Sequence, residues 1–175
     1  AKKLLEAGMK EAGQSQLNLT LLADDADVSK QVAEYLQGAF EDLPNVKVTI
    51  KSIPKAQRLQ AMMSGNYDMV VTGWQSIFAD AYNFLDVWIS NSSYNTSGYK
   101  DAKLDQLLSE TETKYGNEPQ KRWTMLQDAE KILMKDQGTL PLYQANNLEL
   151  LRSSVKGVSF NPNGTPYDFK TAYIQ

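Results

Sequence analysis

The sequence predicts an α/β fold in which a mixed, mostly parallel sheet is flanked by helices. Alternating or continuous apolar residues mark strands at 17–22, 46–51 and 67–72, and apolar residues at helical spacing mark helices at 27–42 and 53–64. The connections between these segments are short, which favours parallel neighbours joined by right-handed crossovers. Of the 175 residues, 42% are hydrophobic, so a full core can form without disulfides.

The three predicted strands differ in their apolar patterns. Residues 17–22 and 46–51 alternate between apolar and polar side chains, which is typical of a strand with one buried face. Residues 67–72 contain Met69, Val70 and Val71 in succession, and such a continuous run predicts burial on both faces.

Polar residues indicate where the helices begin and end. Asp27 and Ser52 are predicted N-caps of the two crossover helices, and Pro54 suits a first helical turn. Before the first strand, one helix face is predicted to carry Leu4, Leu5, Gly8 and Ala12, and Gly13 ends that helix. Because the chain starts without Met inside a helix, we expect a piece of a longer protein, so a missing targeting segment carries no information.

The second half of the chain has a different organisation. Residues 74–100 predict a long loop with a short helix at 84–89, and its many aromatic residues favour a functional loop over a disordered one. Two helices follow, and their buried faces are predicted to carry Leu104, Leu107, Leu108 and Tyr115, then Trp123, Leu126, Ala129, Ile132 and Leu133. Strands are predicted at 140–143 and 148–151, and the tail, 157–175, is expected to wrap the surface.

Composition excludes several kinds of chemistry. The 18 basic and 21 acidic residues give a net charge of −3, which offers no electrostatic footprint for nucleic acid. The sequence has no Cys and no His, which excludes thiol nucleophiles, histidine-based triads, and thiolate or imidazole metal sites from these residues. Phosphate-binding glycine loops and the G-x-S-x-G elbow are absent too. These absences favour binding over catalysis, with no cofactor.

Two groups of carboxylates allow a functional and an ordinary explanation. Asp24, Asp25 and Asp27 could suggest a calcium loop, but the glycine and distal glutamate of an EF-hand are missing, and a helix N-cap explains the cluster. Asp80 and Asp86 could form a catalytic pair, although solvated side chains are the simpler explanation. An enzyme would require one of them in a pocket with a perturbed pKa.

Gly73 and Trp74 follow the third predicted strand directly. Open α/β sheets present their ligand sites at the carboxyl ends of such strands. Glycine lets another backbone approach closely, and the Trp side chain offers a flat apolar face with an N–H donor. The alternative is that Trp74 caps the core, and spacing alone does not decide between the two.

A series of short motifs runs along the chain. The motifs are AKKLLEAG (1–8), YDMVVTGW (67–74), FL (84–85), SNSSYNT (90–96), Tyr99, LDQLL (104–108), RW (122–123), AEKIL (129–133), LPLY (140–143) and VKG (155–157). In this order and spacing they resemble the solute-binding proteins of peptide ABC importers, of the oligopeptide- and dipeptide-binding class. The resemblance implies a type II periplasmic-binding-protein-like lobe. Because family members are much longer, residues 1–175 are expected to be a single lobe, the C-terminal one, without the N-terminal lobe.

The resemblance also implies a function. Two lobes close on an extended oligopeptide that is held mainly through its backbone, and the loaded protein delivers it to the membrane permease of an ABC importer. It implies a non-catalytic protein without cofactor or metal, extracytoplasmic, either as a cell-surface lipoprotein or in the periplasm. Related proteins take nickel, haem or sugars, or receive peptide pheromones. The lack of His argues against nickel and haem in this lobe, whereas Trp74 and Trp88 would suit a sugar.

A small set of ligand-binding residues carries over from the family pattern. The set is Trp74, Gln75, Ser76, Ile77, Asp80, Asn95 and Tyr143. Trp74 matches an aromatic residue that lies against the peptide, and the three residues after it match the segment that runs alongside. Asn95 and Tyr143 match positions that face the cleft.

One position departs from the family pattern. Many members carry an acidic residue three positions after this Trp, where it pairs with the amino terminus of the peptide. The residue here is Ile77, and the nearest acid is Asp80. We therefore expect little discrimination between free and blocked peptide amino termini, unless Asp80 or an acid in the other lobe takes over.

Overall fold

The computed structural model describes all residues from Ala1 to Gln175. Their contacts divide the chain into two compact units, Ala1–Gly73 and Trp74–Gln175. That both belong to a single lobe, as the sequence predicts, stays a prediction.

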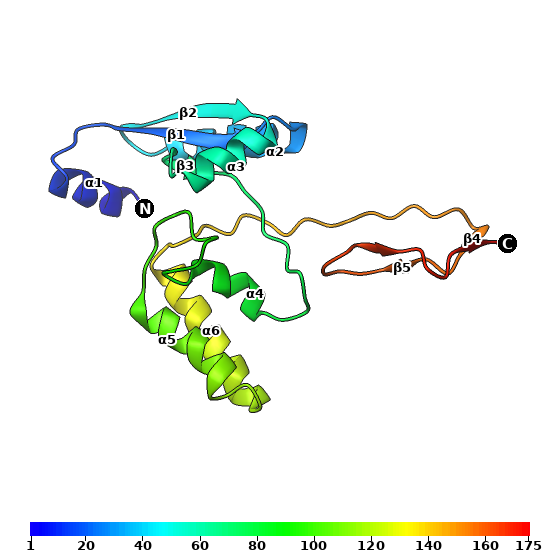
Figure 1. Ribbon diagram of the computed structural model, residues 1–175. Helices are drawn as coiled ribbons and strands as arrows, with labels where there is room; N and C mark the ends of the chain where they lie inside the picture. The colour runs from blue at the N-terminus through cyan, green and yellow to red at the C-terminus, as the bar shows by residue number, and fades with distance from the viewer. The chain divides into compact units, whose positions relative to one another are not determined.

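The first unit has the predicted alternation of helices and strands. Its elements are α1 (Lys2–Glu11), β1 (Leu17–Asp24), α2 (Asp27–Glu41), β2 (Val46–Ile53), α3 (Lys55–Met63) and β3 (Met69–Val70) (Figure 1). The strands form one sheet in the order β2-β1-β3, and both pairings are parallel. This confirms the predicted α/β fold with helical crossovers.

The strand β3 is shorter than the predicted 67–72. Only Met69 and Val70 pair with β1, although the Val71 N–H also donates to the Leu22 carbonyl at 2.8 Å. The Asp68 carboxylate accepts the Thr20 N–H at 2.8 Å. A side chain therefore fills a position on β1 that a longer β3 would have paired.

Both predicted N-caps are wrong by one or two residues. Ala26 is the N-cap of α2, and Asp27 lies in the first turn, where its charge still faces the positive end of the helix. Pro54 is the N-cap of α3, because β2 continues in register with β1 as far as Ile53. Ser52 instead donates its hydroxyl to the Asp24 carbonyl at 3.2 Å.

The core of the first unit lies between the sheet and α2. Its buried side chains are Leu21, Ala23, Ala33, Leu36 and Val48. By contrast α1, which ends before Gly13 as predicted, buries none of its residues.

Two side chains of α2 close the outer edge of β2. Gln37 donates to the Val48 carbonyl at 2.7 Å, and Glu41 accepts the Val48 N–H at 3.0 Å. The bond from the Val48 backbone N–H, together with one from the Lys47 side-chain ammonium, lowers the pKa of Glu41. The backbone of β2 at Val48 is thus satisfied on its open side.

A buried arginine joins the carboxyl ends of the strands. The guanidinium of Arg58, on α3, bonds the Asp24 carboxylate through Nε at 2.9 Å and the Thr72 hydroxyl through Nη1 at 3.0 Å. Only 4% of Arg58 is exposed. Because a charge this buried needs partners, Arg58 ties the end of β1 to the chain that leaves β3.

The second unit is mainly helical. Its elements are α4 (Tyr82–Leu85), the 3₁₀ helix η1 (Asp86–Trp88), α5 (Ala102–Thr113), α6 (Pro119–Lys135), β4 (Val155–Lys156), β5 (Ser159–Phe160), β6 (Tyr167–Asp168) and β7 (Tyr173–Ile174). The short helix predicted at 84–89 is present and begins at Tyr82. None of the helices in either unit combines the length and hydropathy of a membrane span.

The helices α5 and α6 pack on each other around a second core. Its buried members are Leu85, Leu104, Leu107, Leu108, Met125, Leu126, Ala129 and Leu133. This confirms the leucines and Ala129 predicted for the two helix faces, while Tyr115 and Ile132 are partly buried beside them. The prediction for Trp123 is wrong: 52% of it is exposed, and Met125 fills the core instead.

The chain after α6 differs from the predictions. The predicted strands 140–143 and 148–151 have no strand beside them and lack regular structure, since a strand exists only where another pairs with it (Figure 1). The tail, expected to wrap the surface, pairs with itself instead. It forms two small antiparallel sheets, β4 with β7 and β5 with β6.

Candidate ligand-binding site

The candidate site centres on the segment from Trp74 to Ile77, which begins the second unit. The Trp74 side chain is 41% exposed, and its Nε1–H donates to the Asn83 carbonyl at 2.6 Å. The Tyr94 ring packs edge-on against it, with 5.2 Å between ring centroids. Trp74 is therefore not enclosed in the core, and its role in ligand binding stays a prediction.

Asn83, at the start of α4, holds both ends of this segment. Its backbone carbonyl accepts the Trp74 indole N–H, and its side-chain Oδ1 accepts the Ile77 N–H at 2.9 Å. Asn83 itself is buried. Its role was not predictable from the sequence, because no spacing or motif distinguishes a buried Asn that organises a loop from an exposed one.

The three residues after Trp74 alternate in direction. The Ser76 side chain is buried, and its hydroxyl donates to the Phe78 carbonyl. Gln75 and Ile77 are exposed, Ile77 by 69%. The backbone N–H and carbonyl of Gln75 make no hydrogen bond within the chain. The segment therefore presents an unpaired backbone donor and acceptor beside the open face of Trp74.

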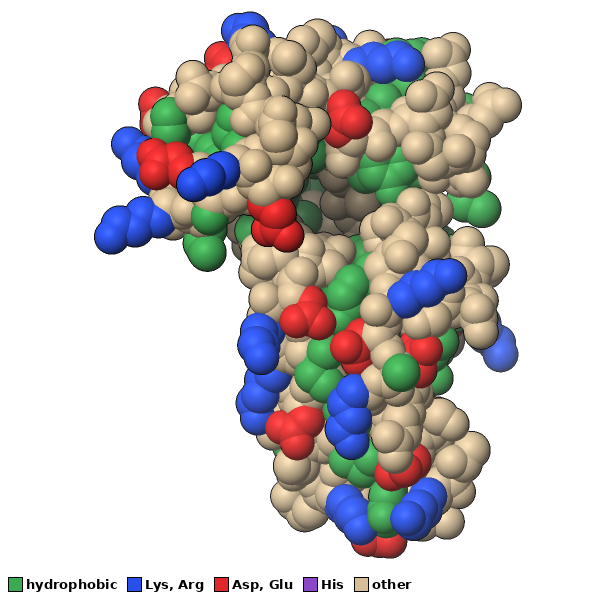
Figure 2. All heavy atoms as spheres, turned by 90° about the vertical axis from the view of Figure 1, so that its left-hand side faces the viewer, with side chains coloured by type: hydrophobic (Ala, Val, Ile, Leu, Met, Phe, Trp, Pro, Cys, Tyr) green, Lys and Arg blue, Asp and Glu red, His purple; other side chains and the backbone are tan.

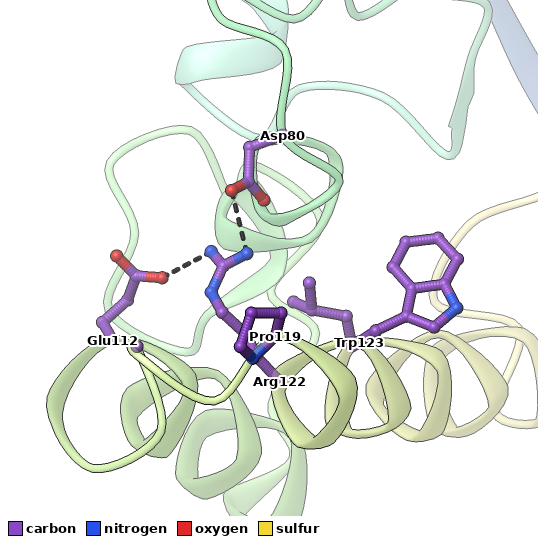
Figure 3. A pocket seen from close by; sticks show the side chains of 7 residues that line it. Asp80, Glu112, Pro119, Arg122 and Trp123 are labelled. Carbon is purple, nitrogen blue, oxygen red and sulfur yellow. Dashed lines mark hydrogen bonds and ion pairs between the residues drawn. The ribbon is translucent and has the colours of Figure 1, made fainter.

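Asp80 lies next to this segment and is already paired. Its carboxylate bonds Arg122 on α6 at 2.8 Å and accepts the Tyr82 N–H at 2.8 Å. Figure 3 shows the Arg122 guanidinium between Asp80 and Glu112, which it bonds at 2.7 Å. The bond to Glu112, more than that to Asp80, raises the pKa of Arg122, so the group stays charged.

A cavity of about 440 Å³ adjoins this ion-pair cluster. It is lined by Asp80, Glu112, Gly116, Pro119, Arg122, Trp123 and Leu126. In Figure 3 the Trp123 ring points away from the charged groups. Each charged group that lines the cavity bonds another, so the cluster fixes Asp80 and the two helices.

The other two predicted site residues lie outside this segment. The Asn95 amide donates to the carbonyls of Trp88, Ile89 and Tyr99, at 3.4, 3.2 and 2.8 Å, so it holds the loop that presents Tyr94. The Tyr143 side chain is 64% exposed, and no hydrogen bond or ring contact joins it to the other candidates. Their roles in ligand binding stay predictions.

Several apolar side chains close to the segment in sequence or in contact with it are exposed. Beside Trp74 and Ile77, the side chains of Phe78, Phe84 and Tyr94 are exposed. The pair of tryptophans expected for a sugar is not formed, because Trp88 packs against the α5–α6 core and Trp74 against Tyr94.

Charge does not gather over the face drawn in Figure 2. There, acidic and basic side chains are interspersed. No group of three or more acidic side chains in the chain is arranged to hold a metal ion. The candidate site thus offers an exposed Trp74 ring, with Tyr94 edge-on against it, and the unpaired backbone groups of Gln75.

Comparison with known proteins gives a consistent picture. Residues 1–96 match the sequence profile of the bacterial extracellular solute-binding proteins, family 5 middle region. A dipeptide-binding protein from Lactococcus lactis is 33% identical over 100% of this chain and 32% of its own length. The chain thus spans about a third of the length of the curated relatives it matches.

Solved structures agree with this relationship. The substrate-binding domain of an oligopeptide ABC transporter from Bacillus anthracis superposes with a TM-score of 0.87 at 31% identity, over 97% of this chain and 33% of that one. The pheromone receptor PrgZ, described with its mode of peptide binding, superposes with a TM-score of 0.83 at 31% identity. This match covers 100% of this chain and 34% of the receptor chain. Profile, sequence and fold lead to one conclusion: the chain belongs to family 5 of the bacterial extracellular solute-binding proteins.

Proposed function

We propose that this chain forms part of the substrate-binding component of an ABC importer and contacts an extended oligopeptide through the segment Trp74–Ile77. The observation that carries the proposal is the unpaired backbone of Gln75, which lies beside the exposed face of Trp74. In antiparallel strand addition, the N–H and carbonyl of one residue can both bond the residue opposite, so Gln75 can bond one peptide residue twice. Side chains of the peptide then contact the surrounding aromatic surface without being selected strictly.

The names of the relatives support a peptide as the class of ligand. The relative from Lactococcus lactis is a dipeptide-binding protein, and the pheromone receptor PrgZ is described with its mode of peptide binding. We extend this to the whole protein: it binds peptide outside the cytoplasm, either anchored as a lipoprotein or in the periplasm, and delivers it to permease subunits without catalysis. A second lobe of the same protein completes the cleft.

A pheromone receptor is the second candidate function. The structural similarity to the pheromone receptor PrgZ, which covers the full chain, favours this second function. A receptor would bind one peptide sequence far more tightly than others of the same length. An importer that relies on backbone bonds would bind many peptides within a narrow range of affinity, so titration with a peptide library separates the two.

Removing the Gln75 N–H tests the proposed pairing. Gln75→Pro in the full-length protein is expected to weaken peptide binding about tenfold, since one hydrogen bond is lost and the adjoining carbonyl shifts. Gln75→Ala keeps the backbone and should change the affinity by less than about threefold. Calorimetric titration with a single pentapeptide measures both variants. Equal affinities for Gln75→Pro and Gln75→Ala would refute the pairing.

Blocking the amino terminus of the peptide tests how the ligand is anchored. Ile77 carries no charge, and the Asp80 carboxylate is occupied by Arg122 and the Tyr82 N–H. We expect free and acetylated forms of one peptide to bind the full-length protein within about tenfold of each other, or ~1.4 kcal/mol. A loss of about a hundredfold on acetylation would show that a buried acid anchors the ammonium group, leaving peptide binding itself intact.

A further inference from the structure

The tail of the chain touches the candidate site at one point. The antiparallel strands β5 and β6 are joined by a turn in which the Asn161 N–H donates to the Pro166 carbonyl at 2.9 Å. The Asn161 amide also donates to the Thr165 carbonyl at 3.0 Å. The rings of Phe160 and Tyr167 pack edge-on across the two strands, 5.9 Å apart. These contacts hold the turn in one shape.

Gly164, at the tip of this turn, lies against the backbone of the Trp74–Ile77 segment. Its N–H donates to the Ser76 carbonyl at 3.3 Å. Its φ is +70°, and a Cβ added there would lie 3.0 Å from the Ile77 carbonyl oxygen. Only a residue without a side chain reaches this position without displacing one of the two backbones.

The turn and Asn83 together fix the inward-facing groups of the segment. The Asn83 side chain accepts the Ile77 N–H, and the Ser76 hydroxyl donates to the Phe78 carbonyl. The Ser76 carbonyl accepts the Gly164 N–H. The backbone groups of Gln75, which is exposed and has no backbone partner within the chain, are then the ones left for a ligand. Since hydrogen bonds weaken steeply with distance and angle, a shift of Ser76 would misplace the neighbouring Gln75 groups.

We infer that the β5–β6 turn, through Gly164, is a positioning element for ligand binding that sets the placement of the Gln75 backbone. This inference rests on the proposed function for its effect on affinity. Gly164 acts through Ser76 and Ile77 and does not itself contact the ligand. The tail, remote in sequence, would thereby tune affinity for peptide backbones independently of side-chain preference.

Two substitutions and a matched control test the inference in the full-length protein. Gly164→Ala adds a Cβ against the Ile77 carbonyl and also strains the backbone. Gly164→Asn adds the same Cβ with less strain, because Asn tolerates positive φ. Gly65→Ala is the control, since Gly65 has a φ of +68° and nothing within 4 Å of its added Cβ.

We expect both Gly164 variants to bind a pentapeptide at least about fivefold more weakly than wild type, whereas Gly65→Ala stays within about twofold. A double-mutant cycle with Gln75→Pro should be non-additive, because both changes act on the same hydrogen bonds. A purely structural role of the turn would give additive losses. Additive losses, or wild-type affinity in both Gly164 variants, would overturn the inference.

A ligand-free measurement separates this inference from the proposed function. In amide NMR spectra, Gly164→Asn should shift the signals of residues 75–77, and Gly65→Ala should leave them in place. If the wild-type protein binds no peptide, the proposed function fails, and these spectra still decide whether the turn positions the segment. Unchanged signals at 75–77 in Gly164→Asn would contradict the inference even if the peptide binds.

Discussion

Asp24→Ala is expected to destabilise the first unit by about 3–5 kcal/mol, because it leaves a buried guanidinium without its carboxylate. The Arg58 side chain is 5% exposed, and Asp24 is its only charged partner. Its remaining bonds go to the Thr72 hydroxyl and the Met62 sulfur, neither of which neutralises the charge. Urea unfolding, followed by hydrogen exchange at the β1 amides, measures the loss and locates it.

A double variant provides the control for this prediction. Replacing the pair together, with Asp24→Leu and Arg58→Met, removes both charges from the buried site. Such exchanges are often neutral or stabilising in proteins, so the double variant should be more stable than Asp24→Ala by at least about 2 kcal/mol. A double variant as unstable as Asp24→Ala would show that the cost arises from packing rather than from the unpaired charge.

Trp74→Ala is expected to weaken peptide binding by the full-length protein about thirtyfold or more, or ~2 kcal/mol. Trp74 is the largest exposed apolar side chain beside the free Gln75 backbone, and Asn83 and Tyr94 hold its ring in place. Trp74→Phe keeps a flat ring but loses the N–H bond to Asn83, so a smaller loss of about threefold to tenfold is expected.

Trp123→Ala is the matched control for Trp74→Ala. Trp123 is also half-exposed, at 52%, but it lies on α6 by the cavity near Arg122 and is not part of the Trp74–Ile77 segment. Its removal should leave the peptide affinity within about twofold, since surface changes away from a site have small effects. Calorimetric titration compares the three variants. If Trp123→Ala loses as much affinity as Trp74→Ala, then Trp74 has no specific role.

The first unit was predictable because each of its elements has a local signal. Leu19 and Leu21, alternating with polar residues, and Val46 and Val48 in the same pattern, mark two strands that pair in register. The cap residues were misplaced because helix starts depend on where the preceding strand stops pairing. For α3 that point is Ile53, which pairs with Asp24 at the end of β1, and no local pattern reveals this register.

The predictions for the second unit failed where structure depends on distant partners. The apolar stretches at 140–143 and 148–151 have strand-like composition, but the chain places no strand beside them. Trp123 has helical spacing with Leu126, yet it lies at the margin of the buried stripe, where Met125 packs better. Asn83 and Gly164 were missed as organisers of the site, because their roles arise from contacts with the 74–77 segment.

The segment between α6 and β4 differs from β2 in one respect that matters for self-association. The outer edge of β2 is closed by Gln37 and Glu41, whereas the backbone of residues 139–151 makes no hydrogen bond within the chain. Leu148 and Leu150 in this segment are 92% and 100% exposed. An open backbone with alternating leucines is a template on which another copy of the chain can add a strand. Pro141 lacks a backbone N–H and so removes one donor from this segment, and Glu149 places a charge between the two leucines. Both residues oppose β-pairing between copies of the chain.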